Sequence, residues 1–179
     1  MTSDKHLSAE KLEQGVKHIL TAPSDMGKLM LIVTRPEVDQ RETPAEGHLD
    51  IEQGLVGDNW STRGHSDRDV QLTIMNARVT GLVAQTRDRW SLAGDQLYLD
   101  MDLSDNNLPP GTQLSLGDAI IEVTEPPHTG CKKFAARFGV DATVFVNSGR
   151  GKKLNFRGIN AKVVQSGDIN VGDVARKLA

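Results

Sequence analysis

The chemistry available to this chain centres on its only cysteine, Cys131, which follows the segment 125–130. Two prolines in that segment are expected to end the preceding strand, because each lacks the backbone N–H that a sheet ladder needs. Gly130 is expected to let the backbone bend close to a ligand. Two lysines follow the thiol, and neighbouring cations favour the thiolate, which attacks electrophiles and binds soft metals. The alternative interpretation is a small buried core residue.

Positive charge is concentrated after this cysteine, although the 179-residue chain has a formal net charge of −3. From position 131 to position 162, Asp141 is the only acid, against eight basic residues: Lys132, Lys133, Arg137, Arg150, Lys152, Lys153, Arg157 and Lys162. Eight cations and one acid give this segment +7, which leaves −10 for the remainder. A basic segment on an acidic body predicts a local site for an anionic ligand, with a solvated surface loop as the alternative.

Other uses of the cysteine segment are open at this stage. His128 and Cys131 have a spacing that suits one shared metal ion, with His48 or His65 added in space, although a structural zinc site usually offers more cysteines. The same pair would suit a Cys-His nucleophile, but no orienting residue is evident. The sequence contains no Walker A motif and no G-x-G-x-x-G after a strand.

The elements that must position this segment are mostly short strands. Apolar runs or alternation predict strands at 28–34, 70–74, 97–103 and 119–124, and 154–164 is predicted as a strand pair or one bent strand. Helices are predicted at 9–21, capped by Ser8, and from Asn76 to about Gln85. We expect one or two helical turns at 134–138, a short apolar run at 143–146 and a polar loop at 147–151.

Gly-Asp pairs mark several of the turns between these strands. They begin at positions 57, 94, 117, 167 and 172, without a fixed period. Asp58, in the first pair, is expected to bind backbone N–H groups or a basic partner. Many short strands between such turns, with few helices, indicate a mostly antiparallel barrel or sandwich.

Length and composition restrict the class of protein. The chain is long enough for one domain, and we expect an N-terminal helical extension at 1–27 followed by the domain proper at 28–179. A single cysteine excludes an internal disulfide framework. The polar N-terminus has no apolar signal segment, and no apolar run is long enough to cross a bilayer. A cytoplasmic protein that binds neither nucleic acid nor membrane is therefore expected.

The order of the motifs is more specific than any one of them. The series occupies positions 54–58, 68–72, 94–97, 108–112, 116–118, 121–124, 127–133, 157–158 and 167–173. In this order, and with the cysteine, it resembles the MOSC domain, the C-terminal domain of molybdenum-cofactor sulfurases. The likeness runs from about residue 28 to about residue 175, which is nearly the whole chain.

This resemblance implies a fold, a cofactor and a role for the cysteine. The fold would be mainly β, a closed or partly open barrel of the pyruvate-kinase-barrel kind with strongly bent strands and a few short helices. The domain would bind the molybdenum cofactor, molybdopterin, and Cys131 would be either the molybdenum ligand or a persulfide sulfur carrier. By position, Arg41 and Arg68 resemble family basic residues that contact the pterin phosphate, and Asn155 and Arg157 are further candidates.

Four residues beside the cysteine complete the predicted cofactor site: His128, Gly130, Lys132 and Lys133. The family's usual Gly-Glu-Asn-Leu is replaced by Gly-Asp-Gln-Leu at 94–97. The pyridoxal-phosphate desulfurase domain of larger family members has no room here, so pyridoxal phosphate is not expected in this chain. A cysteine desulfurase or an electron-transfer protein is the expected partner.

Three functions remain as alternatives at this point. The first is a stand-alone cofactor-binding protein that takes part in sulfur transfer. Family members coupled to redox partners reduce N-hydroxylated compounds, so the second is a molybdenum-dependent reductase component. The third is a non-catalytic module that binds an anion or the cofactor.

Overall fold

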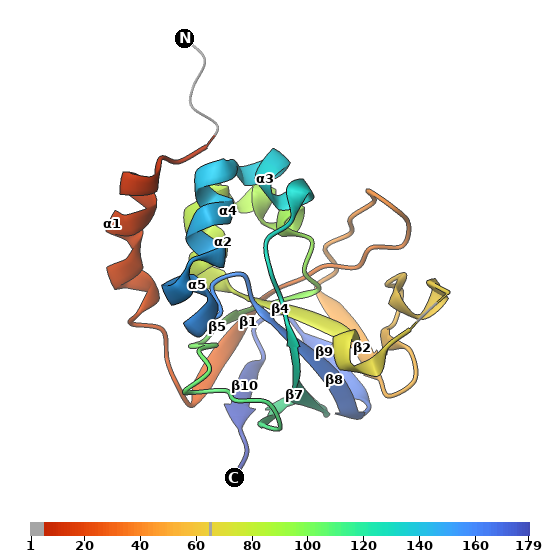
Figure 1. The fold of residues 1–179 in the computed structure, drawn as a ribbon. Helices are drawn as coiled ribbons and strands as arrows, with labels where there is room; N and C mark the ends of the chain where they lie inside the picture. Colours follow the sequence, from red (N-terminus) through yellow and green to blue (C-terminus); the bar gives the residue numbers. More distant parts are fainter. Residues whose placement is uncertain (1–5, 65) are drawn as a thin grey trace.

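Seven strands close into a barrel in the computed structural model, which describes residues 6–64 and 66–179 (Figure 1). Around the barrel the order is β1 (Met26–Ile32), β10 (Val174–Lys177), β6 (Gln113–Leu116), β7 (Ala119–Pro127), β8 (Ile159–Gln165), β4 (Leu72–Asn76) and β5 (Leu97–Asp100). Neighbours are antiparallel except β4 and β5, which run parallel. The predicted barrel is therefore confirmed, and the sandwich alternative is wrong.

A three-stranded sheet accompanies the barrel. It has the order β3 (Gly54–Leu55), β2 (Glu46–Asp50) and β9 (Gly167–Asn170). Its buried aliphatic residues, Leu49, Leu55 and Ile169, join the same apolar core as the inward-facing barrel residues. The sheet and barrel therefore share one hydrophobic core.

Strand β7 differs from the prediction that its prolines would end it. It continues to Pro127, which lies opposite Ile159 of β8. The pairing shifts register between Val123 and Pro127, so the prolines occupy an irregular part of the ladder where a missing N–H is tolerated. The bent strand carries the chain directly to the cysteine segment.

The five α-helices of the described residues gather over one end of the barrel (Figure 1). They are α1 (Ala9–Ile19), α2 (Ala77–Ala84), α3 (Lys132–Phe138), α4 (Val140–Asn147) and α5 (Gly149–Lys153). Three 3-10 segments complete the structure: η1 (Trp60–Thr62), η2 (Arg68–Val70) and η3 (Arg87–Ala93). Ser8 caps α1 and the Asn76 side chain caps α2, as predicted. Within the described residues, no helix is both long and apolar enough to cross a membrane.

Helices α4 and α5 were not predicted from the sequence. The run at 143–146 has low helix propensity because three of its four residues are β-branched, but Ala142, Phe145 and Val146 are buried on one helical face. Tertiary packing therefore decides the conformation. The predicted loop at 147–151 contains the start of α5, which Ser148 caps through its side chain. The predicted strand region 154–164 becomes a turn followed by β8.

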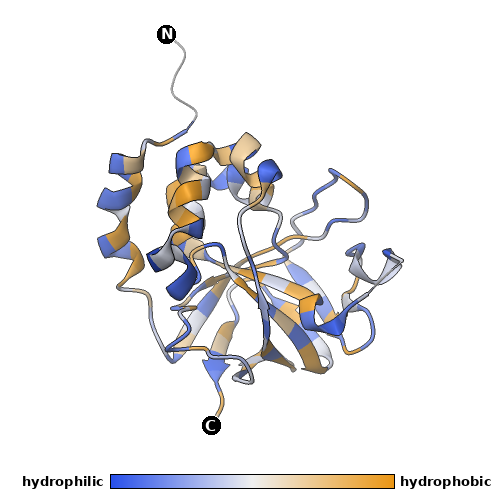
Figure 2. Cartoon of the chain, in the orientation of Figure 1, coloured by the Kyte–Doolittle hydropathy of each residue, from blue (hydrophilic) through white to orange (hydrophobic). Residues whose placement is uncertain are grey.

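Helix α1 packs its apolar face against the other helices. Leu12, Val16 and Ile19 are buried in a second core that lies between the helices and the barrel. Figure 2 shows the hydrophobic side of α1 turned towards the neighbouring helices and its hydrophilic side outward. The division at residue 27 remains a prediction, but α1 itself contributes to the core.

Candidate functional site

The segment around Cys131 is held between β7 and the helices. Cys131 occupies the N-cap position of α3, and its side chain is exposed. The preceding residue, Gly130, is clamped by Asn147 of α4. Its N–H donates to Asn147 Oδ1 at 2.8 Å, and its carbonyl accepts from Asn147 Nδ2 at 3.0 Å. Helix α4 thus fixes the backbone immediately before the thiol.

The surroundings of Cys131 favour its thiolate. Desolvation is the largest influence and raises the pKa of the thiol, but it is outweighed by groups that stabilise the anion. These are the backbone N–H groups of Phe134 and Lys133 and the charges of Arg157 and Arg137. The net effect lowers the pKa of Cys131 below its ordinary value, as expected for a cysteine among cations.

Cys131 opens onto a cavity of about 290 Å³ that is strongly cationic. Predicted site residues Arg41, His128, Lys133 and Arg157 line this cavity with it. Six cationic side chains and two acidic ones are present, a net charge of +4: Arg35, Arg41, Arg63, Lys133, Arg137 and Arg157 against Glu37 and Asp39. We call this space the Cys131 cavity.

Three arginines bind successive carbonyl groups of the turn before β5. Arg137 donates to the carbonyl of Leu92 at 2.8 Å, and Arg157 donates to that of Ala93 at 3.0 Å. Arg35 donates to the carbonyl of Gly94 at 3.0 Å. Gly94 has φ +88°, which suits glycine, and a β-carbon there would lie 3.5 Å from an Arg137 nitrogen. The turn therefore gathers arginines from three distant parts of the chain.

Two buried aspartates anchor two of these arginines. Asp58 accepts from Arg35 Nε at 2.8 Å and Nη2 at 2.7 Å, a bidentate pair. Asp95 accepts from Arg157 Nη1 at 2.6 Å. The expected basic partner of Asp58 is confirmed. Both aspartates belong to Gly-Asp pairs, but the sequence predicts a binding role only for Asp58.

Two buried arginine atoms have no hydrogen-bond partner among the described residues: Arg41 Nε and Arg157 Nε. Both arginines line the Cys131 cavity. Burial, and then the like charges of Arg137 and Arg35, lower the pKa of Arg41. Buried donors are normally paired, so this arrangement is suited to an anionic ligand.

The remaining predicted residues lie outside the Cys131 cavity lining. Arg68 is exposed on η2 and donates to the carbonyl of Val163 at 2.9 Å. Asn155 donates to the carbonyl of Leu103 at 2.8 Å. Lys132 is exposed on α3, and Gly130 has the backbone role described above. These four predicted cofactor contacts are therefore not brought together with Arg41.

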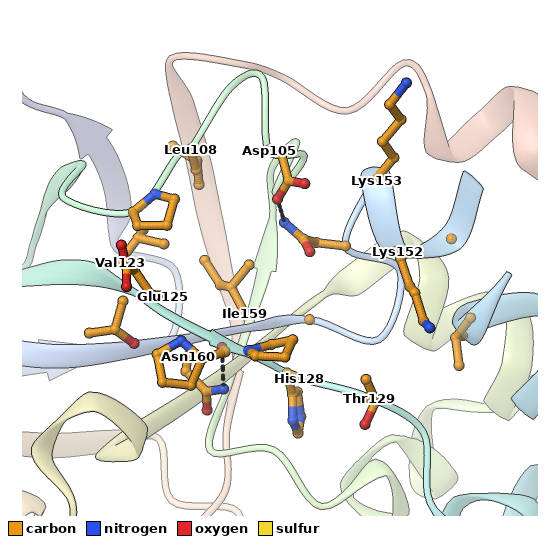
Figure 3. A pocket seen from close by; sticks show the side chains of 18 of the residues that line it. Asp105, Leu108, Val123, Glu125, His128, Thr129, Lys152, Lys153, Ile159 and Asn160 are labelled. Carbon is orange, nitrogen blue, oxygen red and sulfur yellow. Dashed lines mark hydrogen bonds between the residues drawn. The ribbon is translucent and has the colours of Figure 1, made fainter. Parts of the chain in front are cut away.

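A second, larger cavity of about 630 Å³ shares His128 with the Cys131 cavity. Figure 3 shows His128, Thr129 and Lys152 along one side, with Leu108 and Val123 on other walls. The negative charges of its two acidic residues, Asp105 and Glu125, offset the positive charges of Lys152 and Lys153. The two cavities thus differ in charge, and Asn155 belongs to the neutral one.

The structure does not support the alternative in which His128, Cys131 and a further histidine bind one metal ion. His48 lies on β2, where its Nδ1 is 2.6 Å from Asp168 Oδ1. His65 falls outside the described residues. Residues 6–64 and 66–179 contain no cluster of three histidine, cysteine or carboxylate side chains arranged to hold a metal ion.

Sequence reasoning missed several residues of this site. Arg35 directly follows the strand predicted at 28–34 but was not selected, and Asp95 was identified only within a Gly-Asp turn and the 94–97 motif. Glycine beside aspartate is common in turns, so the motif alone does not distinguish a buried anchor. Arg137 belongs to the basic segment but was not selected. Its carbonyl partner lies 45 residues earlier in the chain.

Comparisons with known proteins agree with this architecture. A family model described as the MOSC domain matches residues 65–176. Similar solved structures include a hypothetical protein (21% identity, TM-score 0.59, covering 89% of this chain and 71% of that one). Another is YiiM from Escherichia coli, with 18% identity and a TM-score of 0.55, covering 85% of this chain and 70% of that one. A third is YuaD from Bacillus subtilis, with 15% identity and a TM-score of 0.56, covering 84% of this chain and 94% of that one. The search of curated proteins found no match. The family match covers more than half of the sequence, and the chain belongs to the MOSC domain family.

Proposed function

We propose that this protein binds the molybdenum cofactor in the Cys131 cavity, with the Cys131 thiolate as a ligand of the molybdenum. The MOSC family is associated with this cofactor. The observation that carries the proposal is that Cys131 shares one cavity with Arg41 and Arg157, whose buried Nε atoms have no partner among the described residues.

The residues present fit a phosphorylated pterin. Arginine forms charge-assisted and often bidentate hydrogen bonds to phosphate, and these are the stronger class of hydrogen bonds. Arg41 is the leading candidate for the phosphate, because its side chain is not neutralised by a buried carboxylate as Arg35 is by Asp58. A bound anion would also offset the repulsion between Arg41, Arg35 and Arg137.

Cys131 would supply a soft sulfur ligand. Thiolates are preferred by soft metals, and the cations near the thiol favour this form. When bound, the cofactor would supply redox chemistry at its metal, while the protein binds and orients it. For reduction of N-hydroxylated compounds, electrons would come from a separate electron-transfer protein.

A second candidate, a persulfide carrier, is favoured by the exposure of Cys131. The thiolate would attack the outer sulfur of a persulfide on a cysteine desulfurase. A new sulfur–sulfur bond would form at Cys131 as the donor's bond breaks, and the donor cysteine would leave as a thiolate. The proton of the persulfide would stay on the transferred sulfur.

Pterin retention tests the cavity assignment. Wild type, R41Q and R68Q would be purified from a host that makes the cofactor, and released pterin would be quantified per protein. R41Q should retain less pterin than wild type by a factor of about ten or more, since a hydrogen bond to a charged group contributes roughly 1.5–3 kcal/mol. R68Q should match wild type, because Arg68 lies outside the cavity lining.

Two results would contradict the cavity assignment: wild type without pterin, or equal retention by R41Q and wild type. Intact mass after incubation with a desulfurase and cysteine tests the second candidate. A persulfide carrier gains one sulfur atom, and C131S gains none. Absence of that gain in wild type would exclude the carrier role with the desulfurase used.

A further inference from the structure

Asp95 holds two functional side chains at once. Its carboxylate is completely buried, with Oδ1 at 2.7 Å from His128 Nε2 and Oδ2 at 2.6 Å from Arg157 Nη1. Both partners line the Cys131 cavity, whereas Asp95 itself does not. Asp95 therefore acts on that cavity through the two side chains that it orients.

The ionisation of Asp95 decides which ring nitrogen of His128 carries a proton. Desolvation is the largest single influence and raises the pKa of Asp95. Arg157 and His128 together lower it by more, so the net shift is downward. An ionised carboxylate only accepts hydrogen bonds. His128 Nε2 must then be the donor, and the neutral ring has its lone pair on Nδ1.

The ring of His128 lies where it can meet a ligand. The imidazole lines both the Cys131 cavity and the larger neutral cavity, and 18% of its side chain is exposed. Among the residues that the structure describes, Nδ1 has no hydrogen-bond partner, whereas Nε2 is bound to Asp95. Arg157, Lys133, Lys152 and Glu125 are among the charged groups that line the same two cavities, and Asp95 binds the ring from behind them.

We propose that Asp95 is a positioning residue that fixes His128 in the Nε2–H tautomer, so that His128 Nδ1 is the proton acceptor of this site. An O–H or N–H bond of a molecule bound beside His128 would break, and an Nδ1–H bond would form. The ionised Asp95 would stabilise the resulting imidazolium, as the buried carboxylate does in an Asp-His pair of a hydrolase. The proposal adds a proton acceptor to the proposed cofactor site. The part that this acceptor plays in a reaction rests on the proposed function.

The substitution D95N makes a specific prediction, because Arg157 has only donors. The amide introduced by D95N would turn its oxygen towards Arg157, which needs an acceptor. The NH2 group of that amide would then face His128 Nε2, which would have to accept. The neutral ring should therefore change from the Nε2–H to the Nδ1–H tautomer.

Nitrogen NMR of histidine-labelled, ligand-free protein measures this directly, with H128N used to assign the His128 signals. We expect Nε2–H in wild type and Nδ1–H in D95N at a pH where the ring is neutral. D58N is the matched control, since it alters the other buried aspartate–arginine pair, and it should retain the wild-type tautomer.

An Nδ1–H tautomer in wild type, or an unchanged Nε2–H tautomer in folded D95N, would overturn the proposal. The wild-type measurement stands even where D95N fails to fold. The NMR measurement needs no cofactor, so its result does not depend on whether the proposed cofactor site is correct. The pterin content of the purified protein tests that site separately.

Discussion

At the scale of single residues, Cys131 depends on a small number of charges that come from different elements. Arg137 lies on α3 itself, whereas Arg157 precedes β8. Both favour the thiolate, and they oppose the desolvation that favours the thiol. Reactivity at neutral pH is thus a property of the assembled cavity, in addition to the local Cys-Lys-Lys sequence.

R137Q tests this view of the thiol. Loss of the Arg137 charge should raise the pKa of Cys131, which leaves less thiolate at pH 7 and slows alkylation by iodoacetamide. The rate should be measured across pH, where the midpoint for R137Q should move upward. R150Q is the control, because Arg150 pairs with Glu13 on α1 and does not line the cavity. An unchanged midpoint in R137Q would contradict a role for this charge.

At the scale of elements, the helices hold the cysteine segment against the barrel. Helix α4 binds Gly130 through Asn147, and α1 packs against both α2 and α4. The turn before β8 adds a steric condition. Gly158 has φ +120°, and a β-carbon there would lie 2.3 Å from the carbonyl oxygen of Ile74. Only glycine fits this position, which directly follows Arg157.

L12A tests whether α1 is part of the folded unit. Leu12 is completely buried, so its truncation should lower the free energy of unfolding by about 2–5 kcal/mol. Leu20 directly follows α1 and is 58% exposed, so L20A should change stability by less than about 0.5 kcal/mol. Urea denaturation gives both values. Equal effects of the two substitutions would show that α1 does not contribute through its buried face.

At the scale of the whole molecule, buried aspartate–arginine pairs make stability depend on pH. Desolvation raises the pKa of Asp58, but Arg35 and backbone N–H groups lower it to below its ordinary value. A carboxylate with a depressed folded-state pKa contributes stability above its unfolded pKa of about 3.9. That contribution is lost as the pH falls through the lower folded-state value.

D58N should therefore destabilise the protein most at neutral pH. Removing one partner of a buried ion pair costs roughly 3–5 kcal/mol, and the difference from wild type should shrink below about pH 3.9. Urea denaturation at pH 7 and at acid pH measures the two differences. A D58N effect that is the same at both pH values would refute the assigned protonation behaviour.

The sequence was informative where a pattern is local. Apolar runs and alternation predicted β1, β4, β5 and β7 of the barrel, and Ser8 and Asn76 predicted helix starts. The cysteine segment supplied His128 and Lys133, whereas the family resemblance supplied Arg41 and Arg157. It was uninformative where contacts are distant, as for Asp95, which joins residues 33 and 62 positions later. Arg68 had the right residue type for phosphate, but its place on η2 directs it to the Val163 carbonyl instead.

The central claim, that Cys131 coordinates molybdenum, is tested most directly by X-ray absorption at the molybdenum edge. Wild type and C131S would be purified from a cofactor-producing host and compared at equal pterin content. We predict one fewer sulfur ligand per molybdenum in C131S, or loss of the metal while pterin remains bound by the arginines. The same number of sulfur ligands and the same metal content in both proteins would contradict the assignment of Cys131 as the ligand.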